Sequence, residues 1–254
     1  MNYFDLFINE TKVHFFEMRQ YWFETVTALL MIVGIFVGLF FGVKSLMPGM
    51  SEGDSLDGLV FGFLLWSFAS SAYNAVAKSI IEDTQKGYIE HLFMCPAGFS
   101  KLMLTRTLAE LIIGYGYLIL IAFVAMWATD NWIDINFFWL FCLLMLAAPS
   151  LVGLGFLISG LALLFKKVET VGMMLSLAFM GLVALDGLPF NIFTLLPFVP
   201  GASLARDVIV AQQPVNLVHV GIVALNSLVY CLVGLMVFRR MEKLAKQRNL
   251  IGKY

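Results

Sequence analysis

The sequence predicts an all-α integral membrane protein with six transmembrane helices, an amphipathic N-terminal interface helix and a broken outer segment between the fifth and sixth spans. Three observations lead to this prediction. First, 61% of the 254 residues are hydrophobic and only 13% are charged, whereas a soluble domain has about 25% charged residues. Second, apolar runs long enough to cross a bilayer recur along the chain. Third, lysine and arginine gather on one set of alternate connections between these runs.

Residues 1–24 have the pattern of a helix that lies in the membrane interface. Apolar side chains recur at steps of three and four residues, and acids and bases occupy the other side; the apolar set includes Phe4, Ile8, Phe15, Met18 and Trp22. This spacing puts the apolar residues on one helix face. Because the stretch carries acids, we expect no signal peptide here.

The apolar runs predict the six spans as residues 26–43, 58–77, 108–128, 137–165, 170–185 and 217–238. The fifth run is short for a full span. Residues 186–214 contain no uninterrupted run of helical length, because Pro189, Pro197 and Pro200 break it. Irregular backbone at membrane depth must be covered by protein or water. We therefore expect short, broken helices that dip in from the outer face, within a single transmembrane domain covering residues 1–254.

The distribution of positive charge predicts the orientation. If both termini are cytoplasmic, all but two of the 16 lysine and arginine residues fall on the cytoplasmic side; the exceptions are Lys44 and Arg206. This bias follows the positive-inside rule. It predicts a multi-pass protein of the plasma membrane, or of the inner membrane in a Gram-negative bacterium, with residues 80–106 in the cytoplasm.

The sequence offers no reactive constellation and predicts that the chain is not an enzyme. His14, His91 and His219 fall on different segments. Zinc-protease, serine-hydrolase and nucleotide-binding motifs are absent. The three cysteines are widely spaced in or beside apolar segments, so neither a disulfide framework nor a metal site is expected. No basic patch points to nucleic acid, and the middles of the first, second, fourth and sixth spans carry no charge, which argues against an ion-driven carrier.

Residues 80–106 form the longest polar interruption between strongly apolar segments. This charged, helix-forming stretch lies between two spans, and its charged side chains can make charge-assisted contacts with a soluble partner. Within it, Gly87-Tyr88-Ile89-Glu90-His91-Leu92-Phe93-Met94-Cys95-Pro96 resembles the pattern Gly-Thr-Leu-Glu-x-Leu-x-x-x-Pro of the type-2 ABC transporter permeases. Tyr88 departs from the usual threonine.

The wider layout is also similar to that family, whose permeases have six spans and an outer broken segment. The resemblance implies that residues 81–96 include a coupling helix that rests on a separate ATPase subunit. The residues implied to contact that ATPase are Glu82, Asp83, Lys86, Gly87, Tyr88, Glu90 and Pro96. It further implies a second permease copy, in a homodimer rather than a heterodimer, and ATP with magnesium on the partner, with no cofactor in this chain.

Glu110 is the one acid inside a predicted span, and Arg106 lies four residues earlier on the same helix face. This spacing predicts a local ion pair. A contact that links the 80–106 stretch to the third span is the alternative.

The side chains of the predicted spans bear on the kind of cargo. The spans are rich in phenylalanine, methionine, leucine and glycine, which suits an apolar or amphipathic cargo, drug-like or lipid-like. The same residues are ordinary packing residues in lipid. Export of a polysaccharide or other glycoconjugate, an ATP-independent carrier or channel, and a non-transporting membrane anchor for a soluble partner stay open as alternatives.

Overall fold

The computed structural model describes residues 3–46, 54–85, 92, 94, 98–130, 132–165 and 168–247. These residues form α-helices and one short 3₁₀ helix, with no strand among them. The elements are α1 (Tyr3–Gln20), α2 (Trp22–Leu46), α3 (Asp54–Gln85), α5 (Phe99–Thr129), α6 (Phe137–Phe165), α7 (Glu169–Ala184), η1 (Ile192–Leu195), α8 (Val199–Ile209) and α9 (Leu217–Gln247).

Among the described residues, five helices are long and apolar enough to cross a membrane: α2, α3, α5, α6 and α9. This all-helical architecture is that of a multi-pass membrane protein. The predicted fifth span is α7, which has 16 residues and is about 24 Å long at 1.5 Å per residue. That length is short of a hydrocarbon core of about 30 Å, so six full spans are not established.

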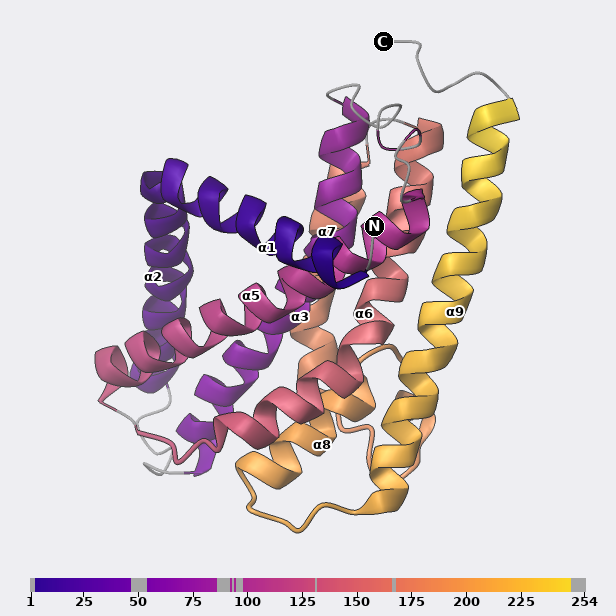
Figure 1. Cartoon of the computed structure of the whole chain (residues 1–254). Helices are drawn as coiled ribbons and strands as arrows, with labels where there is room; N and C mark the ends of the chain where they lie inside the picture. The colour runs from indigo at the N-terminus through magenta and orange to yellow at the C-terminus, as the bar shows by residue number, and fades with distance from the viewer. Residues whose placement is uncertain are drawn as a thin grey trace.

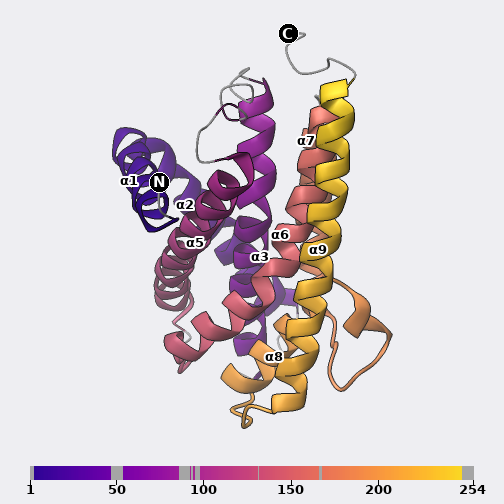
Figure 2. The same ribbon diagram turned by 45° about the vertical axis from the view of Figure 1, so that its right-hand side comes forward.

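The long helices alternate in direction. The C-terminal ends of α3, α6 and α9 lie at one end of the bundle, and α8 lies at the opposite end (Figures 1 and 2). We call these the α3-end face and the α8 face. The C-terminal ends of α3, α6 and α9 each lead into a segment that the charge bias predicts to be cytoplasmic.

The core is built around α6, which packs on α9 and α3. Sixteen of its residues are buried, and glycine allows the close approach: a Cβ on Gly153 would overlap the backbone of Tyr230 in α9, and one on Gly155 would lie 2.9 Å from the Tyr73 carbonyl oxygen in α3. Small residues permit such packing between helices in lipid, where hydrophobic burial gives no net attraction.

The segment between α7 and α9 holds η1 and α8 in place of one long helix. Hydrogen bonds from α9 satisfy its irregular backbone. The Asn226 amide donates to the carbonyl oxygens of Thr194 at 2.9 Å and Leu196 at 3.2 Å, and the Tyr230 hydroxyl donates to that of Leu195 at 2.8 Å. These polar residues of the last span therefore hold the broken segment in place.

The α1 helix lies across α5 and connects directly to α2 (Figure 1). It buries Leu6 against the bundle, while Phe4 and Phe15 are 71% and 64% exposed. Exposed aromatic side chains of this kind suit the headgroup level of a bilayer. The α2 helix stands at the side of the bundle and buries only Phe36 and Phe40.

Candidate functional site: an ionic bridge between α3 and α5

The candidate site begins at the C-terminal end of α3. We predicted a span ending at residue 77 and a separate coupling helix from residue 81, but α3 continues without a break to Gln85. The reason is that residues 78–85 contain no glycine or proline, and charged residues do not end a helix that has left the hydrocarbon. Glu82 and Asp83 thus lie in the last turns of a helix that begins at Asp54.

Asp83 sits where a negative charge is unfavourable, because the C-terminal end of a helix carries a partial negative charge. The last turn of α3 holds no basic residue to offset it. The compensating charge comes from α5: the Arg106 guanidinium donates to Asp83 Oδ2 at 2.8 Å. The side chains are 29% and 14% exposed, so water screens this pair only partly.

Arg106 also faces Glu110 one turn further along α5, with 3.6 Å between Arg106 Nε and Glu110 Oε1. The sequence raised a local ion pair and a link between the 80–106 stretch and the third span as alternatives. In the structure, one guanidinium makes both contacts, because its fork of donors can reach two carboxylates.

The α1 helix covers this bridge from outside. A small cavity of about 30 Å³ lies between α1 and α5, and its lining includes Glu10, His14, Arg106 and Glu110. Burial raises the pKa of Glu10, an effect that Arg106 opposes and that Glu17 and Asp83 reinforce. Burial also lowers the pKa of His14, with Glu17 opposing and Arg106 adding to the effect.

Glu10 and His14 were not candidate site residues in the sequence analysis. Glu10 stands on the polar face of the interface helix, where a water-facing role is the ordinary expectation. Only the crossing of α1 over α5 brings these residues to Arg106, and nothing in the sequence marks that crossing.

Five of the predicted contact residues, Lys86, Gly87, Tyr88, Glu90 and Pro96, lie outside the described residues. Of the others, Glu82 is 3.6 Å from the Lys78 amine in an exposed i,i+4 pair, which contributes about 0–1 kcal/mol. Within the described parts of the chain, no group of histidine, cysteine and acidic side chains could hold a metal ion. The site is therefore an ionic bridge that joins the two helices flanking residues 86–97.

No family model, curated protein or solved structure matches this sequence.

Proposed function

We propose that this chain is the transmembrane subunit of an ATP-driven exporter, and that separate ATPase subunits bind it through residues 81–96. The observation that carries the proposal is the resemblance of residues 87–96 to the coupling segment of type-2 ABC permeases. The described helices support it: the C-terminal end of α3 and the N-terminal end of α5, which flank this segment, are joined by the Asp83–Arg106 pair.

The ionic bridge gives this proposal a physical basis. Asp83 lies in α3 before residues 86–97, and Arg106 lies in α5 after them. Their ion pair therefore joins the two helices that flank this segment. A push on the segment would then move α3 and α5 together. Coupling of ATP hydrolysis to transport requires such a connection, because hydrolysis takes place on another subunit.

Two cavities support an apolar or amphipathic cargo. One, of about 410 Å³, lies between α2, α3, α7 and α8, with Phe36, Phe63 and Met180 in its walls. The other, of about 510 Å³, lies between α3 and α7. Its lining combines apolar side chains such as Met173 and Leu177 with the polar side chains of Tyr73, Asn74, Ser176, Lys78 and Glu82. Both volumes are within the range of about 300–1,000 Å³ for ligand pockets. The charge bias supports a further proposal, that the chain lies in the plasma membrane with cytoplasmic termini. From the family resemblance we also propose a homodimer.

The proposal predicts a neighbouring gene for an ABC ATPase, and the test is reconstitution of that ATPase with this chain in vesicles. We expect the chain to change the ATPase rate, and we expect Gly87→Arg and Glu90→Arg to abolish that change while the protein still inserts. Gln213→Arg, an exposed change in the connection between α8 and α9 at the opposite end of the bundle, is the control and should leave coupling intact.

Export of fluorescent amphiphiles from the same vesicles separates the alternatives. ATPase binding without ATP-dependent export would indicate an anchor. Export driven by an ion gradient without ATPase would indicate a secondary carrier. Unchanged coupling in both arginine variants would sink the proposed role of residues 81–96.

A further inference from the structure

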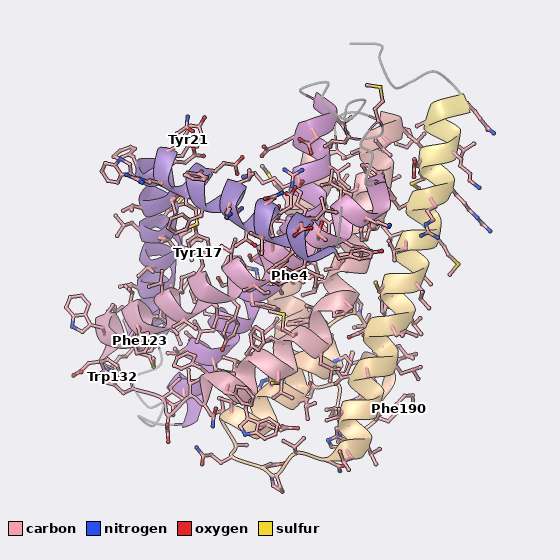
Figure 3. The ribbon with its side chains drawn as sticks, viewed as in Figure 1. Phe4, Tyr21, Tyr117, Phe123, Trp132 and Phe190 are labelled. Atoms are coloured by element: carbon pink, nitrogen blue, oxygen red, sulfur yellow. The ribbon has the colours of Figure 1, made fainter. Side chains whose placement is uncertain are left out.

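A third cavity, of about 470 Å³, lies between the first half of α2, α3 and α5, with His14 of α1 at its edge. It shares Asn74 and Lys78 with the 510 Å³ cavity, and its own lining adds Glu24 and several hydroxyl groups. Tyr117 marks its place beside α5, in the space between α2 and the rest of the bundle (Figure 3). The volume suits part of an amphipathic molecule.

One face of α3 supplies most of the polar lining. Ser67, Ser70, Ser71, Asn74 and Lys78 recur at helical spacing and all line the cavity. From the first to the last of these residues the helix rises about 16 Å, so the stripe reaches from the membrane interface toward the bilayer centre. Polar groups at that depth mark binding sites and pathways by default.

The hydroxyl groups of this stripe differ in access. The Ser70 Oγ is enclosed by protein and has no hydrogen-bond partner within the described residues. Ser71 is exposed and Ser67 is half-buried. Ser67 and Ser71 are therefore the hydroxyl groups that can donate to an acceptor oxygen of a ligand in the cavity.

Two opposite charges stand at the shallow end of the cavity. Glu24 lies in the first turn of α2 and forms no ion pair with any part of the chain that the structure describes. Within the described residues, the Lys78 amine pairs with the exposed Glu82 carboxylate, at 3.6 Å. The cavity thus presents a free carboxylate and a weakly held ammonium, which complement a ligand that carries both a cation and an anion.

Below these charges the lining is neutral: hydroxyl groups on α3 face apolar side chains of α2 and α5, which include Ile32 and Ile121. A glycerophospholipid has the same order of groups: charges outermost, ester carbonyl oxygens beneath them and hydrocarbon deepest. Its phosphate can accept from Lys78, its ammonium can donate to Glu24, and an ester carbonyl can accept from Ser71. A primary ammonium fits better than a quaternary one, because only the former donates hydrogen bonds to a carboxylate.

We propose that the cavity between α2, α3 and α5 binds the headgroup and glycerol backbone of a phospholipid that carries a phosphate and a primary ammonium. The acyl chains lie along Ile32 and Ile121 and pass into the surrounding lipid. This site belongs to one protomer, faces the leaflet on the α1 side, and does not depend on any ATPase.

The test uses the full-length protein in detergent, without the ATPase, titrated with dioctanoyl phosphatidylethanolamine, phosphatidylcholine and phosphatidylglycerol. Native mass spectrometry counts bound lipid, and the shift of Tm follows saturation because a ligand of the folded state raises Tm. We expect phosphatidylethanolamine to bind tightest. Glu24→Gln should remove roughly tenfold of its preference over phosphatidylglycerol, and Lys78→Gln should weaken both by a similar factor, since one charged hydrogen bond contributes about 1.5–3 kcal/mol.

Two controls complete the design. Lys243→Gln, on the exposed end of α9, should leave all three affinities unchanged. Glycerophosphoethanolamine, the soluble headgroup compound, should bind far more weakly than the lipid, because it lacks the acyl chains. Equal binding of all three lipids, preferential binding of phosphatidylglycerol, or equally tight binding of the soluble compound would each overturn the proposal.

Discussion

The two sides of this helix bundle use glycine in opposite ways. On the α6 side, Cβ atoms on Gly153 and Gly234 would overlap the facing helix backbones. On α2, Gly34, Gly38 and Gly42 have the same four-residue spacing as a packing motif, yet a Cβ on any of them would meet nothing within 4 Å. The spacing of glycines in the sequence therefore does not predict which of them pack against another helix of the same protomer.

The difference also explains where the cavities lie. Close backbone approach between α6 and α9 leaves no room for a ligand, and hydroxyl groups in that core bond to backbone, as Ser227 Oγ does to the Ala147 carbonyl oxygen at 3.3 Å. Around α2 the helices stand apart, and polar side chains line open space. The tight side gives the protomer its stability, and the loose side offers the binding surfaces.

Replacing a glycine that packs against another helix should cause the largest loss of stability. Gly234→Leu puts a side chain where the backbone of Gly153 already lies, and overpacking of even a few methylene groups costs about 1–3 kcal/mol. We expect loss of folded protein by size-exclusion chromatography in detergent. Gly38→Leu is the matched control and should fold with a Tm close to wild type. Equal damage from both variants would contradict the contrast between the two sides.

Breaking the ionic bridge should come next. Arg106→Gln leaves Asp83 and Glu110 without their counter-charge, and a charged hydrogen bond contributes about 1.5–3 kcal/mol. We expect a clear fall in Tm, measured by thermal unfolding in detergent without added lipid. Lys78→Gln removes only an exposed pair, so its cost should stay below about 1 kcal/mol. A larger fall in Tm for Lys78→Gln than for Arg106→Gln would contradict a stabilising role of the ionic bridge.

On the tight side, a single hydroxyl should matter less than the bridge. Tyr230→Phe removes the hydrogen bond to the Leu195 carbonyl oxygen and keeps the ring, at a cost of about 0.5–1.5 kcal/mol. We expect a small fall in Tm together with faster amide exchange in η1. Tyr117→Phe, which alters a cavity wall on the loose side, should leave η1 exchange unchanged.

The smallest effect concerns pH. Because the pKa of Glu10 is raised above its ordinary value of 4.5, the folded state holds this proton more tightly than the unfolded state, and the resulting stability is lost as pH rises through the folded pKa. His14 acts in the opposite sense: its pKa lies below 6.5, so stability grows as pH rises toward 6.5. We expect the wild-type Tm to carry a contribution from Glu10 that falls as pH rises above 4.5. Thermal unfolding from pH 4 to 8 should show that Glu10→Gln removes this fall. An identical Tm–pH profile in wild type and variant would contradict the buried state of Glu10.

The sequence was sufficient for the helical class and for five long apolar helices, because composition and run length are local properties. It did not predict that the helix of the second span continues to Gln85, nor that Asn226 and Tyr230 of α9 hold the broken segment in place. Their partners are carbonyl groups about 30 residues away, which no local pattern specifies. Arg106 shows the same limit: its spacing to Glu110 is visible in the sequence, whereas its contact with Asp83 depends on how α3 and α5 pack.

The Asp83–Arg106 pair also has a topological meaning. It closes a ring of 24 residues, because the two partners stand 23 positions apart in the sequence. The entropic cost of closing a flexible loop grows only with the logarithm of its length, so a longer or shorter connection between the two residues changes that cost little. The ring can therefore tolerate changes in length or sequence between its ends. Residues between Asp83 and Arg106 that contact a partner can therefore change during evolution while the ion pair is kept.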